Sequence, residues 1–335
     1  MAARRTTPSP SENRGTILGR IYGNLSELIG ETPLLEFDRI RRTRALQSRI
    51  VAKIEYLNPA GSIKDRTAWA IVREAERNGK LKPGDLLVDV TSGNTGIGLA
   101  AVAASRGYRT KFYLRNVISQ DKINILRQYG ADVVLIDNHE FLVENALDVI
   151  LERVRRENPG AFFTDQLGNP ANPRIHFETT GPEIWRDTDG AVDILVGAVG
   201  TGGTISGAGR FLKGQKPGVT IVVAEPTADS LPSKDNPYAE GIEGVHKVTE
   251  VDEDHLPDNF DASVVDEVIA VTPAEARETA RLIAREEGIL AGASAGAVLF
   301  AALAVGARPE NTGKMIVAVI PDSGERYLSP PRVAG

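Results

Sequence analysis

A single lysine in the stretch 58–66 has the setting that covalent amine chemistry needs. The stretch reads Asn-Pro-Ala-Gly-Ser-Ile-Lys-Asp-Arg, and its proline and glycine predict a turn after the apolar run 50–57. Ser62 can cap the helix that follows, which places Lys64 in the first turn. The positive end of the helix dipole favours the neutral amine there, and the neutral amine is the form that makes a Schiff base. Taken alone, Lys64 is better interpreted as a solvated lysine, and the motifs below change that balance.

A second group of polar residues reads Thr-Ser-Gly-Asn-Thr-Gly over 91–96, between an expected buried strand and an expected helix. Hydroxyls and free backbone N–H groups at a helix N-terminus are how proteins hold a carboxylate or a phosphate. The alternative is a tight turn that needs its two glycines for geometry alone. The number of polar side chains in this one turn favours an anion site, and they are Thr91, Ser92, Asn94 and Thr95.

A glycine-rich loop, Gly-Thr-Gly-Gly-Thr over 200–204, has the same strand-to-helix context. It predicts a second oxyanion cradle. Loops of this kind also hold dinucleotide pyrophosphates, and Glu225 ends the next expected strand where a ribose-binding acid would lie. The glycine spacing departs from the G-x-G-x-x-G order, and a dinucleotide enzyme has no need for Lys64. The glycines concerned are Gly200, Gly202, Gly203 and Gly207.

A small-residue turn over 292–296 has Ser294 as its only polar side chain. The serine either caps the helix that follows or points its hydroxyl at a ligand atom, and spacing alone leaves the two interpretations about even. The turn reads Gly-Ala-Ser-Ala-Gly and so has the form G-x-S-x-G, but it lies between two expected helical segments and not at the strand-to-helix turn of a nucleophile elbow, which disfavours a serine hydrolase.

The composition narrows the class of protein. The chain has 335 residues and a net charge of −6, which argues against a nucleic-acid surface. It has no cysteine, and its four histidines lack ligand spacing, so we expect no metal site. No apolar run reaches the ~18 residues that cross a bilayer. We expect a cytoplasmic enzyme with a disordered tail over 1–15, the alternative for that tail being an organellar transit peptide.

Apolar strands alternate with helices along most of the chain, which predicts an α/β fold with doubly wound parallel sheets. We expect two three-layer domains that meet at the carboxyl ends of their strands, where a ligand would bind. The stretch 226–266, between the strand expected over 220–224 and the helix expected over 273–287, is long and weakly periodic. Expected strands cover 34–37, 50–57, 86–90, 111–114, 132–136, 194–199, 220–224 and 315–320. Expected helices cover 21–29, 67–79, 96–106, 121–129, 140–157, 203–213, 273–287 and 296–305.

These segments together resemble the family of cysteine synthases and cystathionine β-synthases, which are β-replacing pyridoxal-phosphate enzymes of fold type II. O-acetylserine sulfhydrylases are the members that the chain resembles most. The resemblance covers nearly the whole sequence, and the order and spacing of its motifs are specific. The motifs are 29–34, 58–66, 91–96, Gln166 with 169–173, 179–183, 200–204, 288–294 and 323–329.

The resemblance implies a role for each motif. Lys64 looks like the Schiff-base lysine, Asn94 like the partner of the ring oxygen, and Ser294 like the residue that meets the pyridine nitrogen. A neutral hydroxyl at that nitrogen favours β-elimination over transamination. The phosphate cradle would be Gly200, Thr201, Gly202, Gly203 and Thr204. The substrate would meet Thr91, Ser92, Thr95, Gln166 and Gly241.

The resemblance also implies a division and a reaction. A larger domain would comprise 16–45 and 166–330, and a smaller mobile domain 46–165 would carry the carboxylate loop. The reaction would be cysteine synthesis from O-acetyl-L-serine and sulfide through an aminoacrylate, in a transferase of the EC 2.5.1 type. Relatives imply a homodimer that acts on a small amino acid and a small nucleophile.

Two places depart from the family pattern. The segment 114–122 replaces a Met-Pro start and a Met-Ser run, and Glu243 replaces a small residue and adds negative charge, unless it points to solvent. The alternatives are therefore a specialised enzyme that uses O-phosphoserine, with Arg115 as the candidate phosphate partner, or one that uses serine. Its nucleophile would be an amine, as in 2,3-diaminopropionate synthesis, or homocysteine, as in cystathionine synthesis. A non-catalytic homologue and a nicotinamide oxidoreductase are more remote.

Overall fold

The structure is a computed structural model that describes residues 21–143, 145–233, 236, 239–252 and 256–329. The tail expected over 1–15 lies outside the described residues, so its disorder stays a prediction. Within the described residues, no helix is both long and apolar enough to traverse a bilayer.

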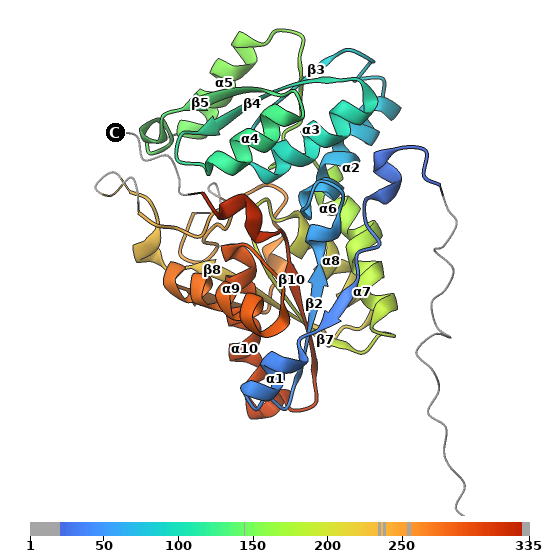
Figure 1. Cartoon of the computed structure of the whole chain (residues 1–335), viewed down its shortest axis with the longest axis vertical. Helices are drawn as coiled ribbons and strands as arrows, with labels where there is room; N and C mark the ends of the chain where they lie inside the picture. The colour runs from blue at the N-terminus through green and yellow to red at the C-terminus, as the bar shows by residue number, and fades with distance from the viewer. Residues whose placement is uncertain (1–20, 144, 234–235, 237–238, 253–255, 330–335) are drawn as a thin grey trace, which may run out of the picture.

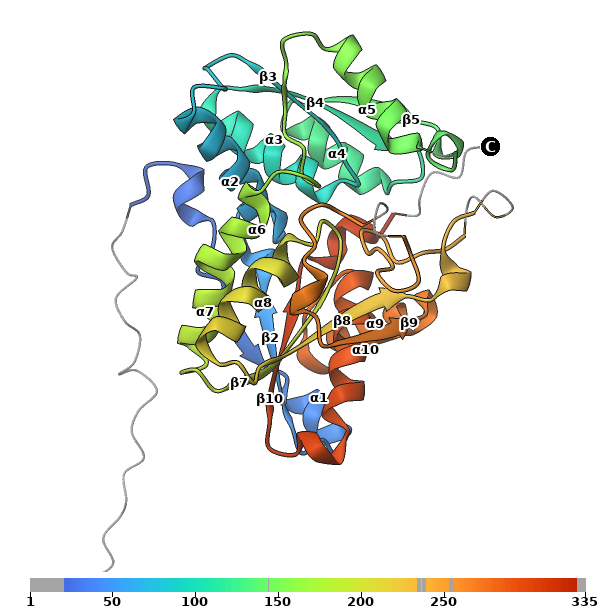
Figure 2. The same cartoon turned by 180° about the vertical axis from the view of Figure 1, so that it is seen from behind.

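The described chain forms two sheets that lie one above the other in Figures 1 and 2. Every strand pair is parallel except β1 with β2. In spatial order, the larger sheet is β1 (Leu34–Glu36), β2 (Arg49–Ile54), β10 (Met315–Ile320), β7 (Val192–Ala198), β8 (Thr220–Pro226) and β9 (Glu267–Val271). The smaller sheet is β5 (Asp132–Ile136), β4 (Arg109–Arg115), β3 (Leu86–Val90) and β6 (Phe162–Phe163).

Helices cover both faces of each sheet, as the doubly wound prediction requires. The helices that belong with the smaller sheet are α2 (Lys64–Arg77), α3 (Asn94–Arg106), α4 (Gln120–Gln128) and α5 (Ala146–Glu157). Those around the larger sheet are α1 (Asp38–Thr43), α6 (Ala171–Ile175), α7 (Gly181–Asp187), α8 (Gly203–Gln215), α9 (Pro273–Glu287) and α10 (Ala293–Gly306). A π-helical turn, His176–Thr180, joins α6 to α7.

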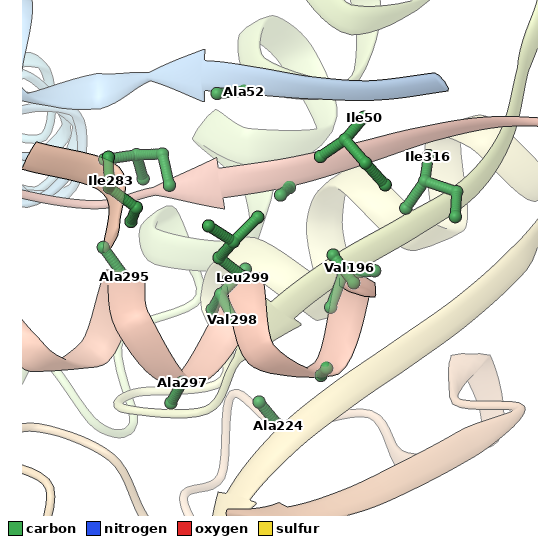
Figure 3. Packing of buried hydrophobic residues seen from close by; sticks show 14 of the residues in the cluster. Ile50, Ala52, Val196, Ala224, Ile283, Ala295, Ala297, Val298, Leu299 and Ile316 are labelled. Carbon is green, nitrogen blue, oxygen red and sulfur yellow. The ribbon is translucent and has the colours of Figure 1, made fainter. Parts of the chain in front are cut away.

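Alternation along β2 explains why this strand lies inside the larger sheet. Ile50 and Ala52 belong to the core cluster on the α10 side, which also holds Leu299 and in which Figure 3 shows Ile50 next to Ile316. Val51 packs in the cluster on the opposite face. Parallel strands with both faces covered are apolar on both faces, and β2 also pairs on both edges, with β1 and β10. The domain boundary expected at residue 46 is therefore corrected, since it would assign β2 to the smaller unit.

The predicted ranges of β3, β5, α9 and β10 are confirmed at both ends. The single helix expected over 140–157 is wrong. A 3-10 turn, Asn138–Phe141, comes first, and α5 begins only after Asn145, whose φ of 55° lies in the left-handed region. The helix expected over 21–29 is also wrong, because only the 3-10 turn Leu25–Leu28 forms there.

Candidate active site

Lys64 is the first residue of α2, at the junction between the two sheets. The Ser62 hydroxyl accepts the N–H of Lys64 at 3.2 Å, and the N–H of Ile63 donates to the carbonyl of Pro321 at 2.8 Å. The start of α2 is thereby attached to the end of β10. Burial lowers the pKa of Lys64 to about 8, against the opposing effect of the Asp322 carboxylate. A substantial fraction of this amine is therefore neutral near pH 7.5.

The loop 200–204 meets Lys64. Gly202 has a φ of +82° and directly precedes α8, so the unpaired N–H groups of the first turn gather here. A Cβ built on Gly200 would lie 3.8 Å from Lys64 Nζ, and one built on Gly203 would lie 2.1 Å from Asn172 Oδ1. Glycine is required at Gly203 because Asn172 fills the space behind it. The lysine and the predicted phosphate cradle therefore face each other.

A hydrogen-bond chain links α2 to this cradle. Thr67 Oγ1 donates to Asn172 Oδ1 at 2.9 Å, and Asn172 Nδ2 donates to Thr201 Oγ1 at 2.8 Å. His176 Nε2 lies 3.3 Å from Thr204 Oγ1, and burial holds the pKa of His176 well below its usual range, with the Arg66 and Lys64 charges acting in the same direction. The cradle is thus backed by neutral groups.

The turn 91–96 comes at the carboxyl end of β3, as predicted. The Thr91 hydroxyl accepts the N–H groups of Gly93 and Gly96 at 3.2 and 3.3 Å, so this side chain shapes the turn itself. Ser92 is exposed, and Thr95 Oγ1 donates to Gln166 Oε1 at 2.5 Å. The structure therefore joins Thr95 to Gln166, which lies 71 residues away in the sequence.

Asp322 is a site residue that the sequence reasoning missed. It follows β10 and is fully buried, and Asn94 Nδ2 donates to its Oδ2 at 2.6 Å. Its Oδ1 has no hydrogen-bond partner among the described residues. A Cβ on Gly292 would lie 2.5 Å from Oδ1, so the start of α10, which carries the half-buried Ser294, packs against this carboxylate. An acid at the carboxyl end of an apolar parallel strand is the signal that could have revealed it.

Glu243 and Lys122 form an ion pair that was not predicted as a pair. Lys122 Nζ lies 2.5 Å from Glu243 Oε1, and the two side chains are 2% and 36% exposed. The two residues come from α4 beside the smaller sheet and from the loop 240–246 beside the larger one. The negative charge that Glu243 adds is therefore offset by a buried cation.

Two predicted residues are not brought to Lys64 by any described contact. Gly241 is exposed, and the atoms nearest to a Cβ built on it belong to Ser230 and Pro232. The Arg115 guanidinium is half-buried at the end of β4 and lies 4.4 Å from the centroid of the Phe141 ring. No carboxylate pairs with Arg115 within the described part of the chain.

Glu225 is occupied, which removes the argument for a dinucleotide site. Its carboxylate accepts the N–H groups of Val248 and Thr249 at 2.7 and 2.9 Å and the Nζ of Lys247 at 2.9 Å. With these partners the side chain holds the segment 247–249 in place. It is not free to bind a ribose.

Comparison with known proteins decides the family. Residues 25–322 match the model of a family described as pyridoxal-phosphate dependent enzymes. The chain belongs to this family. It is 41% identical over 309 residues to a cysteine synthase of Staphylococcus aureus. The aligned region covers 92% of this chain and 96% of the relative.

Solved structures agree with this assignment. The fold is similar to that of O-ureido-L-serine synthase, with a TM-score of 0.82 and 36% identity over 92% of this chain and 94% of that one. It is also similar to a cysteine synthase of Entamoeba histolytica, with a TM-score of 0.79 and 36% identity over 97% and 93% of the two chains. The fold class and the cofactor expected from the sequence are confirmed.

The residues present fit pyridoxal phosphate. A Schiff-base lysine must supply a neutral amine, and Lys64 does so beside a helix N-terminus that can bind a phosphate. Asp322 forms a backbone bridge with Ser62, two residues before Lys64, and accepts a hydrogen bond from Asn94. The buried Oδ1 of Asp322 has no hydrogen-bond partner among the described residues. The described residues contain no cluster of three or more potential metal ligands.

Proposed function

We propose that this enzyme is a cysteine synthase that converts O-acetyl-L-serine and sulfide to L-cysteine and acetate by β-replacement. The observation that carries the proposal is the Lys64 amine, which faces the Gly200 end of the phosphate cradle and has its pKa lowered to about 8. The similarity to two cysteine synthases supports the same reaction.

The chain's own residues would divide the work as follows. The N–H groups of the first turn of α8, with Thr201 and Thr204, would hold the cofactor phosphate, and Asn94 and Ser294 would hold the ring. When bound, pyridoxal phosphate supplies an electron-withdrawing ring that acidifies the α-proton of an attached amino acid. Lys64 would take up that proton once the substrate has displaced it, because it then lies beside the α-carbon.

The turn 91–96 would bind the substrate carboxylate. Its N–H groups lie at the start of α3, where the positive end of the helix dipole favours an anion. The Thr91 hydroxyl already accepts two N–H groups but can still donate, while Thr95 and Gln166 hold each other in position. Ser92 is the exposed polar residue of this turn and would contact the substrate carboxylate when the smaller unit closes.

An absorbance experiment tests the proposal. O-acetylserine, O-phosphoserine and serine are added in turn to the purified protein, followed by sulfide, while the visible absorbance of the bound cofactor is recorded. We expect O-acetylserine alone to shift the absorbance and sulfide to restore it with formation of cysteine. If O-phosphoserine or serine shifted the absorbance instead and sulfide restored it, the enzyme would be a specialised β-replacement enzyme that uses that donor. A Lys64→Ala variant that kept both the absorbance and the turnover would contradict the central assignment and leave a non-catalytic role open.

The alternative within the family is a specialised β-replacement enzyme with another nucleophile. The similarity to O-ureido-L-serine synthase and the charged Lys122–Glu243 pair favour it. An O-phosphoserine donor is less well supported, because the described contact of Arg115 is with Phe141.

We also propose that the enzyme is a cytoplasmic homodimer in which the smaller unit moves. Large apolar side chains exposed on the larger unit, Leu35, Leu57 and Phe177, support a contact with a second copy. Sedimentation at low micromolar concentration would test the dimer, and a monomer there would contradict it.

A further inference from the structure

We infer that His246 is a second catalytic base, which takes the proton of the incoming nucleophile at its Nε2 atom as the nucleophile bonds to the β-carbon. The inference rests on the proposed β-replacement and adds a residue to it. It is carried by two hydrogen bonds that fix the imidazole beside the phosphate cradle, by the tautomer that one of them imposes, and by the place of Lys64 against the same loop.

His246 is attached to the first residues of the cradle. Its backbone N–H donates to the Val199 carbonyl at 2.7 Å, and its ring Nδ1 lies 2.7 Å from the carbonyl oxygen of Gly200. A Cβ built on Gly200 would lie 2.7 Å from the Gly244 carbonyl and 3.8 Å from Lys64 Nζ. The chain around His246 therefore packs on the cradle at the point where the cradle meets the reactive amine.

The bond to Gly200 determines which ring nitrogen carries the proton. A carbonyl oxygen can only accept a hydrogen bond, so Nδ1 must be the donor. In the neutral imidazole, Nε2 is then the basic nitrogen. No described residue donates to Nε2, and the side chain is exposed to solvent. His246 therefore offers a lone pair to a molecule that enters from solvent.

The surroundings of the ring favour its neutral form. The side chain is accessible to solvent, but the protein around it excludes enough water to lower the pKa of His246. The bond to Gly200 opposes this effect, and the charges of Arg115 and Lys64 add to it. Arg115 ends β4 of the smaller sheet, so both units contribute charge at this ring.

The acids on either side of His246 are held by lysines. Glu243, three residues before it, lies 2.5 Å from Lys122 Nζ. Lys247, the next residue, donates from Nζ to Glu225 at the end of β8, at 2.9 Å. These carboxylates are thus engaged elsewhere, and His246 is a neutral base at physiological pH.

Lys64 cannot serve the nucleophile as well. Once it has taken the α-proton, its amine is protonated, and it must return that proton to the α-carbon. Asp322 is fully buried and accepts a hydrogen bond from Asn94, so it does not meet a molecule from solvent. A nucleophile that arrives with a proton therefore needs another base, and His246 is exposed beside the site.

The step balances without an oxidant or a reductant. With H₂S, a Cβ–S bond forms, one S–H bond breaks, and its proton goes to Nε2 of His246. Acetate has left with the electron pair of the Cβ–O bond, and the α-carbon regains its proton from Lys64. His246 then releases its proton to solvent.

The sulfide step, measured at two pH values, tests the inference. The protein is first mixed with O-acetylserine, and the reversal of the absorbance shift by sulfide is then timed by stopped flow. We expect His246→Asn to lower the second-order rate constant of reversal about tenfold at pH 6, where sulfide is mostly H₂S. At pH 9 the loss should be less than about twofold, because sulfide is then HS⁻ and needs no base. An equal loss at both pH values would overturn the inference.

A matched pair of variants separates catalysis from structure. An asparagine can donate from Nδ2 to the Gly200 carbonyl as His246 does, but it has no basic nitrogen. His246→Ala loses both the donor and the base. We expect the two variants to lose the same factor at pH 6. If His246→Asn reacted as fast as the wild-type protein while His246→Ala was slow, the role of His246 would be structural and the inference wrong.

A spectroscopic readout is independent of turnover. The chain has four histidines, so nitrogen-15 labelling of histidine gives few imidazole signals, and those absent from His246→Asn belong to His246. We expect them to show a proton on Nδ1 and none on Nε2, and to titrate below the usual pKa of histidine. A proton on Nε2 of the neutral ring would overturn the inference. If O-acetylserine, O-phosphoserine and serine all left the wild-type absorbance unchanged, the proposed function itself would be wrong.

Discussion

The reactivity of Lys64 depends on two opposing effects at one atom. Burial removes water from the ammonium and lowers its pKa, while the Asp322 carboxylate stabilises the ammonium and raises it. Burial wins, with a pKa of about 8. The neutral amine is therefore available at physiological pH, and Asp322 keeps the pKa from falling further.

This balance predicts a pH profile. In cofactor-free protein, competitive acetylation of Lys64 followed by mass spectrometry should give an apparent pKa of about 8, with reactivity rising up to that pH and level above it. The exposed Lys80 serves as the reference in the same digest. Asp322→Asn should move the Lys64 profile to lower pH, because it removes the charge that raises the pKa. A shift to higher pH would show that Asp322 does not act on this amine.

Among single residues, sequence reasoning found those with a local signature. Lys64 and the loop 200–204 lie beside turns and helix starts that can be recognised in the sequence. Asn172 and Lys122 have no such signature, because each acts on a residue more than a hundred positions away, Thr67 and Glu243 respectively. Asp322 has the weaker signal of an acid after an apolar strand, but its partner Asn94 is 228 positions away. Only the folded chain shows these contacts.

At the scale of elements, a buried ion network holds the start of α2 against the larger sheet. Arg66 Nε lies 2.8 Å from Glu55 and its Nη1 2.6 Å from Glu183, which also pairs with Lys53 at 2.7 Å. All four side chains are at most 3% exposed. Since Arg66 is two residues from Lys64, this network fixes the position of the reactive amine.

Removing the guanidinium should therefore destabilise the fold. Arg66→Met leaves two carboxylates buried with one lysine, and we expect a loss of about 3–5 kcal/mol in the free energy of unfolding. Urea unfolding followed by the fluorescence of Trp69 and Trp185 measures it.

Arg73→Met is the matched control for this prediction. Arg73 lies on the same helix but forms only an exposed pair with Glu178 at 3.4 Å, so the loss should be less than about 1 kcal/mol. Similar losses in the two variants would contradict the importance of the buried network.

Elements with strong apolar patterns were predictable and those set by long-range pairing were not. The sequence predicts β10 and α9 at both ends because each is bounded by breaking or capping residues, as in the capping box of Thr272 and Glu275. It misses β9, the edge strand of the larger sheet, which pairs with β8. The helices α6 and α7 were also missed, since their prolines suggest a loop, although Pro173 and Pro182 lie in first turns where no N–H is needed.

At the scale of the whole molecule, the segment after β10 ties the two units together. Ser119 Oγ, at the start of α4, donates to the Arg326 carbonyl at 2.7 Å. Asp121 accepts the N–H and the hydroxyl of Ser329 at 2.8 and 2.7 Å. Movement of the smaller unit must therefore carry this segment with it or break these bonds.

Asp121→Ala should loosen the segment without unfolding the sheets. We expect amide hydrogen exchange over 323–329 to rise severalfold, while exchange in β10 stays unchanged. Gln120→Ala is the control, because the described side-chain bond of Gln120 is to Asn124 within the same helix. An increase that spread into β10 would mean that the segment and the sheet open together.

The position of β10 also determines when the protein can fold during its synthesis. The four strands of the smaller sheet are complete once residue 163 has been made, whereas β2 and β7 lie on either side of β10, the last strand to be translated. A nascent chain can therefore form the smaller unit early but must hold β2 and β7 with unpaired edges until translation is nearly finished. Unpaired edges are sites of aggregation, so we expect this protein to depend on protection by chaperones late in translation.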